Sequence, residues 1–150
     1  MAKFIYRMQS ILEIKVKLEA QAKTEFAAAK MHLDEEEEKL QILLNRKADY
    51  EEQGRTLRRD SLKVMEIIKN KEAINRMEEF ILFQQKRVMQ AREQLEAARE
   101  RLQEAMQESK THEKLREKAF EAFIHEENAR EAKEVDELTS YTHSRKGRKE

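Results

Sequence analysis

Residues 74–105 read INRMEEFILFQQKRVMQAREQLEAARERLQEA, and their spacing indicates the fold of the chain. Apolar side chains recur here at steps of three and four, which is the heptad pattern of helices that pack along a shared seam. Only Gln84 interrupts the row with a polar side chain. The apolar members of the row are Ile74, Met77, Ile81, Val88, Ala91, Leu95, Ala98, Leu102 and Ala105. We therefore predict a long helix whose seam is rich in small residues and buries little area per turn.

An earlier and weaker stripe of the same kind predicts a second helix. It starts at Phe4, slips in phase between Ala22 and Leu33, and resumes from Leu40 to Leu57. Because this stripe has the same spacing as the first, the two segments are expected to pack on each other.

A break separates the two stripes. Gly54 is the only glycine before residue 147, and glycine commonly ends a helix. Asp60 and Ser61 are residue types that cap a following helix. We expect the chain to reverse here, which would pair residue 4 with about residue 112.

The resulting fold prediction is all-α, a long antiparallel two-helix coiled coil. Helix 1 is expected at about 2–54, the turn at about 55–60 and helix 2 at about 61–139. The alternative is one unbroken helix that dimerises.

The composition excludes several other classes of protein. The chain has 150 residues, of which 41% are charged, with 31 Lys+Arg balanced by 31 Asp+Glu. It contains two glycines and no proline, so it lacks the turn residues that a sheet protein of this length needs. Cysteine is absent, which excludes disulfides and thiolate metal sites. This composition is typical of long helices and coiled coils.

The C-terminal residues lose the apolar stripe from Thr139 onward, and residues 145–149 form a basic cluster, RKGRK. We therefore expect a single coiled-coil hairpin domain over residues 1–140 and a disordered, flexible basic tail over residues 141–150. A DNA-binding zipper carries its basic region N-terminal to the heptads. The cluster lies at the opposite end, so no nucleic-acid partner is expected.

No arrangement of residues typical of catalysis is visible. The histidines form no i,i+4 pair and no HExxH, and nucleotide-binding glycine motifs are absent. A pair of helices also lacks the concave site that acid–base catalysis needs. We expect no enzyme activity, catalytic residue, metal site or cofactor. The histidines are His32, His112, His125 and His143.

The chain has neither a signal-peptide apolar region nor about 20 consecutive apolar residues, so we expect a soluble intracellular protein.

One candidate binding surface lies part-way along the hairpin. Phe80, Leu82 and Phe83 crowd around Ile81, and a helix cannot turn four neighbouring residues inward because successive residues lie about 100° apart. Some of these side chains must face outward or widen the seam into a thicker local core. The hairpin also brings Leu43 and Tyr50 of helix 1 within one or two turns of the segment from Met77 to Phe80. The candidate surface is Leu43, Tyr50, Met77 and Phe80.

A second candidate is the pair of chain ends. Phe4, Ile5, Tyr6 and Met8 make a dense apolar start, and Phe120, Phe123 and Ile124 would project beyond the paired region. Unpaired apolar side chains on a projecting helix suit insertion into a groove or ring. The alternative is that they fold back on each other.

Three segments carry a family resemblance over nearly the whole chain. They are FIYRMQSIL at 4–12, EKLREK at 113–118 and EAKEVDE at 131–137. In this order and spacing they resemble the FliJ family of the flagellar type III protein export apparatus.

The resemblance implies a stalk-like antiparallel coiled coil that binds in the centre of the hexameric flagellar export ATPase and promotes ring assembly. It also implies contact with the cytoplasmic domain of the export gate protein and a link to export chaperones. The protein would be cytoplasmic and peripheral at the inner face of the cell membrane, in flagellum biogenesis and motility. Gate binding would fall on the mid-hairpin surface, and ring binding on Phe4, Tyr6, Arg7, Met8, Phe120, Phe123 and Ile124.

Two other functions remain open at this stage. One is the equivalent stalk of an injectisome type III secretion system, which would have the same shape and a different machine. The other is a generic coiled-coil scaffold with no motor partner.

Overall fold

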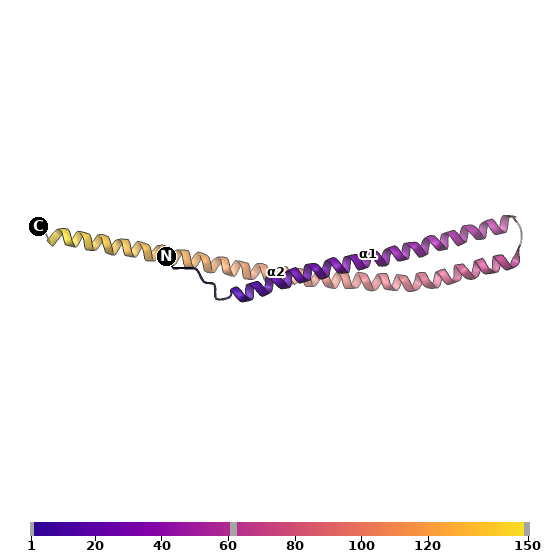
Figure 1. Ribbon diagram of the computed structural model, residues 1–150, viewed down its shortest axis with the longest axis horizontal. Coiled ribbons are helices and arrows are strands. Elements are labelled where there is room, and N and C mark those ends of the chain that lie inside the picture. The colour runs from indigo at the N-terminus through magenta and orange to yellow at the C-terminus, as the bar shows by residue number, and fades with distance from the viewer. Residues whose placement is uncertain (1, 61–62, 149–150) are drawn as a thin grey trace. The chain divides into compact units, whose positions relative to one another are not determined.

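The computed structural model describes residues 2–60 and 63–148 and contains two helices, α1 (Gln9–Asp60) and α2 (Val64–Arg148). Within these ranges there is no strand. Figure 1 shows the two helices running back along each other after the reversal between them. The predicted all-α antiparallel hairpin is therefore confirmed, and a single unbroken helix is excluded.

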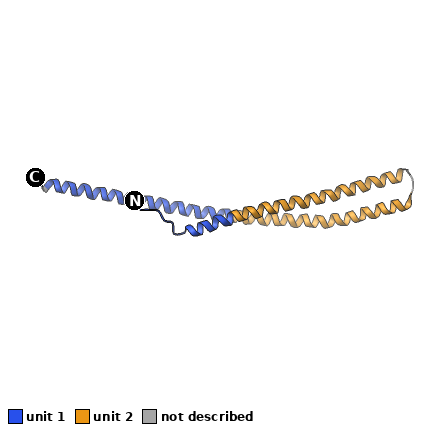
Figure 2. Cartoon of the chain, in the orientation of Figure 1, with its two compact units in different colours: residues 1–19, 105–150 blue, residues 20–104 orange. Residues whose placement is uncertain are grey.

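The contacts divide the chain into two units, shown in Figure 2. Unit 1 joins residues 1–19 to residues 105–150, and unit 2 comprises residues 20–104. In unit 2, Arg101 pairs with Glu25 and Asn70 bonds to Tyr50, so residue numbers fall along α2 as they rise along α1. In unit 1 the ion pair between Lys15 of α1 and Glu108 of α2 continues the same antiparallel pairing.

The core of unit 2 is the predicted seam. Ile81 and Val88 are buried there, and Ala91 and Ala98 are only 1% and 2% exposed. Alanine has no side chain beyond Cβ, so it lets two helices approach closely but removes little apolar area from water. Ala22 is the buried partner residue on α1.

A polar contact lies inside this seam where the sequence has Gln84. Its amide Nε2 donates to the backbone carbonyl of Glu36 at 2.9 Å and also to the Glu36 carboxylate. Glu36 is 1% exposed and Gln84 is 7% exposed. A buried polar group without a hydrogen-bond partner lowers the stability of the folded chain, and in this alignment Gln84 and Glu36 satisfy each other. The pair therefore favours one alignment of the helices.

The predicted role of Gly54 was wrong. Gly54 lies inside α1, is buried, and has no positive φ, so it does not close the helix. A Cβ at this position would come within 2.5 Å of Asn70 Oδ1. Glycine is needed here because the Asn70 side chain crosses to α1 and donates to the Tyr50 carbonyl at 2.8 Å. The glycine serves a close approach between helices.

The helix boundaries also differ from those expected. α1 continues to Asp60 instead of ending at 54, so Asp60 is the last residue of that helix; Ser61 lies outside the described residues. The reversal falls later than the expected 55–60, and the register moves with it. Phe4 consequently lies against Phe120 and not against residue 112.

The other two boundaries shift as well. α1 begins at Gln9 and not at residue 2, because residues 2–8 are non-helical. α2 extends to Arg148, beyond the expected end at 139, and no proline interrupts the sequence there. Flexibility of the basic tail, residues 141–150, stays a prediction, as does the single domain over 1–140. Residues 149–150 lie outside the described range.

Unit 1 has a smaller core. Leu12 is buried on α1, and the non-helical residues 2–8 bring Phe4 back against α2. The buried hydroxyl of Ser109 and the Nδ1 of His112 have no hydrogen-bond partner within the described ranges.

Candidate functional site

The described residues hold no cluster of side chains suited to a metal ion. No group of three or more His, Cys, Asp or Glu residues converges within 2–60 and 63–148. Over the same part of the chain, neither helix contains a segment apolar enough to cross a bilayer. The predicted candidate sites are two surfaces, the mid-hairpin surface in unit 2 and the chain ends in unit 1.

The four residues of the predicted mid-hairpin surface all lie in unit 2, but they differ in exposure. Leu43, Tyr50 and Met77 are half-buried along the seam, whereas Phe80 is 53% exposed. Much of the surface of Leu43, Tyr50 and Met77 is buried by the packing of the two helices. Phe80 is therefore the member with the most area available to a partner.

The crowded residues around Ile81 divide between the seam and the outside of the hairpin, which is the first of the two alternatives that the sequence left open. Ile81 is 7% exposed and faces the seam, while Phe80, Leu82 and Phe83 are all more than half exposed. Successive residues turn by about 100°, so Phe80 and Phe83, three apart, share one flank, and Leu82 points elsewhere. We call Phe80 and Phe83 the aromatic flank. The Arg87 guanidinium lies 5.9 Å from the Phe83 ring centre, which adds a cation to it.

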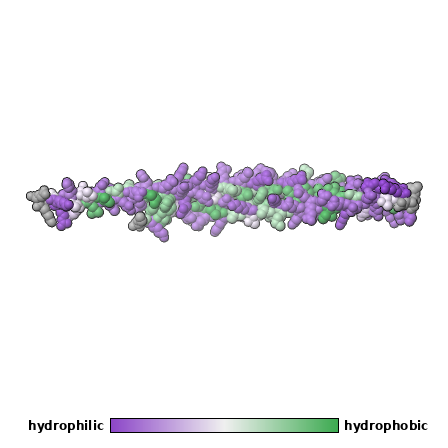
Figure 3. Space-filling model, turned by 90° about the horizontal axis from the view of Figure 1, so that it is seen from above, coloured by the Kyte–Doolittle hydropathy of each residue, from purple (hydrophilic) through white to green (hydrophobic). Residues whose placement is uncertain are grey.

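Phe83 is not a member of the predicted mid-hairpin surface, although it is one of the residues that crowd around Ile81. Which of Phe80, Leu82 and Phe83 is exposed to a partner can be stated only once the direction of the seam is known. Figure 3 shows hydrophobic side chains lying between hydrophilic ones along the face in view.

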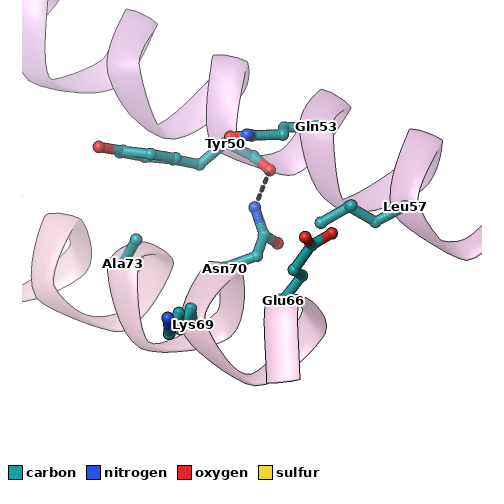
Figure 4. A pocket seen from close by; sticks show the side chains of 7 residues that line it. All are labelled: Tyr50, Gln53, Leu57, Glu66, Lys69, Asn70 and Ala73. Atoms are coloured by element: carbon teal, nitrogen blue, oxygen red, sulfur yellow. Dashed lines mark hydrogen bonds between the residues drawn. The ribbon is translucent and has the colours of Figure 1, made fainter. Parts of the chain in front are cut away.

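A groove lies beside Tyr50, close to the reversal (Figure 4). Figure 4 shows Asn70 reaching the α1 backbone at Tyr50, with Glu66 and Lys69 on the neighbouring turns of α2. The groove has a volume of about 360 Å³. It is shallow and mixed in polarity, and it brings together no pair of groups suited to acid–base chemistry. Its lining is Tyr50, Gln53, Leu57, Glu66, Lys69, Asn70 and Ala73.

The predicted ring-binding residues lie in unit 1, where three of them form an aromatic cluster. Phe4 packs edge-on against Phe120 with ring centres 5.2 Å apart and lies 5.4 Å from Phe123. Tyr6 stacks near Phe4 at 6.5 Å, and the Arg116 guanidinium lies 5.6 Å from the Phe4 ring centre. Of the two arrangements that the sequence left open for the apolar ends, the second is therefore the one present. The ends fold back on each other because residues 2–8 leave the helix.

Part of the apolar surface at this end still faces outward. Ile5 is 79% exposed, and Met8, Phe120 and Ile124 are each about two-fifths exposed. Arg7 is exposed as well. The cluster is therefore held together internally while it presents an apolar and basic exterior.

Two carboxyl groups have pKa values lowered by hydrogen bonds across the seam. The Gln84 amide lowers the pKa of Glu36, against the opposing effect of burial and with further help from Arg87, Lys39 and His32. In unit 1, the Lys15 ammonium, 2.7 Å away, lowers the pKa of Glu108. Both carboxylates bind a side chain of the facing helix, and neither lines the groove beside Tyr50.

Comparisons with known proteins agree with this description. The profile of the family described as "Flagellar FliJ protein" matches residues 4–148. A "Flagellar FliJ protein" of Bacillus subtilis (strain 168) is 28% identical over 134 residues, which cover 89% of this chain and 91% of that protein.

A solved structure has a similar fold. It is described as that of a YscO homologue, CT670, from Chlamydia trachomatis. It aligns with a TM-score of 0.77 over 99% of this chain and 100% of that one, at 22% identity. At this identity the likeness concerns the fold alone.

Proposed function

The chain belongs to the flagellar FliJ family, and on this premise we propose that it is a non-enzymatic component of the flagellar type III protein export apparatus. The family match over residues 4–148 is the observation that carries the proposal. The curated relative is also a flagellar protein, which favours the flagellum over an injectisome.

Within that apparatus, the chain acts as the central stalk and assembly factor of the hexameric export ATPase. A single hairpin inside a sixfold ring cannot contact six subunits equally. Unequal contact stabilises different nucleotide states in different subunits, and such differential affinity is what couples a binding partner to turnover.

The end that enters the ring is unit 1. Its aromatic cluster of Phe4, Phe120 and Phe123 holds the N-terminal residues on α2, and the exposed Ile5 and Met8 lie outside it. Tyr6, Arg7 and Ile124 complete this surface. An internally packed end with apolar side chains outside it suits a hydrophobic bore, because little order has to be gained on binding.

The ring proposal is tested by titrating the chain into the purified export ATPase. Turnover and hexamer formation should both rise. Ile5→Ala should weaken the effect, whereas Met31→Ala, which removes a side chain of similar exposure (64% against 79%) from unit 2, should not. Unchanged assembly and turnover on adding the wild-type chain would leave a generic coiled-coil scaffold as the better description.

The surface that binds the cytoplasmic domain of the export gate is the aromatic flank, with Leu43, Tyr50 and Met77 beside it in unit 2. The exposure of Phe80 and Phe83 supports this assignment, since large exposed aromatic side chains are the usual anchors of protein interfaces.

The gate proposal is tested by alanine substitution on the two sides of α2. Phe80→Ala and Phe83→Ala should each weaken gate binding, while Leu82→Ala on another face, equally exposed at 61%, should have little effect. Helicity should stay the same in all three variants. Equal losses for the three would place gate binding elsewhere.

Export chaperones are the remaining proposed partners, and nucleic acid is not among them. The protein would work in the cytoplasm, held at the inner face of the cell membrane through the export apparatus. Co-purification of chaperones with the chain, competed by the gate domain, would test whether they share the aromatic flank.

A further inference from the structure

The hairpin tip of unit 2, residues 55–60 and 63–71, is strongly basic. Residues 55–71 contain six basic and two acidic side chains, a local net charge of +4 in a chain whose formal net charge is zero. The basic residues are Arg55, Arg58, Arg59, Lys63, Lys69 and Lys71, and the acidic ones are Asp60 and Glu66.

Most of these cations are not neutralised locally. Arg55 pairs with Glu52 at 2.6 Å, and Lys63 lies 4.0 Å from Glu66. The other four form no ion pair with any side chain that the structure describes; they are Arg58, Arg59, Lys69 and Lys71. Elsewhere in unit 2 some basic residues pair across the two helices, as Arg101 does with Glu25, and others, such as Arg46, form no ion pair with a described side chain. The tip is distinguished within the unit by its excess of basic over acidic residues.

Exposed aliphatic side chains lie among these cations. Val64 and Met65 are 63% and 66% exposed and Ile68 is 45% exposed, all within the first two turns of α2. The seam side of these turns is already occupied by Ile67 and Asn70. Val64 and Ile68 are four residues apart and Met65 and Ile68 are three apart, so the three side chains lie on one side of the helix.

We propose that the hairpin tip docks on an anionic lipid surface. Met65, Val64 and Ile68 enter the boundary between headgroups and acyl chains, and the Arg and Lys side chains reach the lipid phosphates along their flexible stems. Basic residues close to an anionic leaflet each strengthen binding by roughly fivefold, and salt screens the attraction. The contact is weak and reversible, because only a few apolar side chains enter the lipid.

A bilayer suits this surface better than nucleic acid or protein does. Residues 55–71 contain no aromatic side chain, so the tip lacks the rings that stack on bases. It likewise lacks the Trp and Tyr anchors that dominate protein interfaces. Aliphatic side chains between long cations are instead the composition of interfacial helices.

The chain contains no tryptophan, so one introduced indole reports on one position. Met65→Trp places it at the tip, and Met31→Trp places it at a residue of matched exposure (64% against 66%) in the same unit. With vesicles of phosphatidylglycerol and phosphatidylcholine at low salt, the emission of Met65→Trp should shift to the blue. Met31→Trp should not shift, and neither variant should respond to pure phosphatidylcholine.

Charge reversal separates the tip from the basic C-terminal cluster. In the Met65→Trp background, Arg58→Glu with Arg59→Glu should lower vesicle affinity by at least about 25-fold, the product of two fivefold effects. Arg145→Glu with Lys146→Glu changes the net charge equally and should leave the Met65→Trp shift in place. Circular dichroism confirms that both double variants keep their helices.

Several results would overturn the proposal. They are the absence of a shift for Met65→Trp with anionic vesicles, an equal shift for Met31→Trp, or loss of the shift in the C-terminal double variant. Retention on duplex DNA without burial of the indole in vesicles would assign the cations to nucleic acid instead. The proposal does not depend on the stalk function, which ATPase stimulation tests separately.

Discussion

Replacing Gly54 by alanine tests the close approach that sets the helix packing near the reversal. In an exposed helix interior, Gly→Ala stabilises by about 1 kcal/mol, because glycine loses more backbone freedom on folding. Here the new Cβ would lie 2.5 Å from Asn70 Oδ1. The Asn70 side chain would have to turn away and lose its hydrogen bond to the Tyr50 carbonyl.

The two effects have opposite signs and similar size. Loss of the hydrogen bond, with a buried amide left poorly satisfied, costs roughly 1–2 kcal/mol. Gly54→Ala in the wild-type chain should therefore lie between neutral and about 1 kcal/mol destabilising. In an Asn70→Ala background the obstructing atom is gone, and the same substitution should stabilise by about 1 kcal/mol. The predicted coupling between the two sites is about 1–2 kcal/mol, which is typical of residues in contact.

The assay is urea denaturation followed by circular dichroism at 222 nm for the four chains of the double-mutant cycle. Transition slopes should agree, so that midpoints report stability. If Gly54→Ala stabilised both backgrounds equally, Asn70 would not pack on Gly54, and this account of the glycine would be refuted.

Three further predictions concern the seam and the aromatic flank. Gln84→Leu removes the hydrogen bond that lowers the Glu36 pKa. A lowered pKa contributes stability above the unfolded value of 4.5, and this stability is lost as pH falls through the lowered value. The difference in thermal midpoint between pH 7 and about pH 3 should therefore be smaller in Gln84→Leu than in the wild-type chain, and an unchanged difference would contradict this role of Gln84. Ala91→Leu forces a large side chain into a position 1% exposed and should destabilise by about 1–3 kcal/mol in urea denaturation, whereas a neutral effect would mean that the helices are not so closely packed. Phe83→Ala, at 62% exposed, should change stability by no more than about 0.5 kcal/mol, and a larger loss would show that its ring belongs to the core.

The candidate surfaces were only partly predictable, for a reason visible at particular residues. The crowding of Phe80, Leu82 and Phe83 around Ile81 shows that some side chains must face outward, because that follows from the helix period alone. Which of them do so depends on where α1 lies, and Ile81 is the one that it covers. Tyr50 was a predicted member of the mid-hairpin surface, yet packing leaves it half-buried.

The chain ends show the same limit. The apolar character of Phe4 and Phe120 is plain in the sequence, but their contact requires residues 2–8 to leave the helix and the register to place residue 4 beside residue 120. Neither condition is a property of a local segment. The hydrogen bond between Gln84 and Glu36 is another case, since only the position of Gln84 in an apolar row hinted that it had a partner.

Local periodicity, charge content and the near absence of glycine and proline were sufficient to determine long amphipathic helices, because helix formation and amphipathicity arise from residues three and four apart. The break between the two stripes favoured an antiparallel hairpin but left one unbroken helix open. The register of the pairing, the function of Gly54 and the choice between buried and exposed aromatic rings were decided only by the tertiary structure. These depend on contacts between residues far apart in the chain, where a shift of one turn exchanges one set of apolar neighbours for another of nearly equal burial.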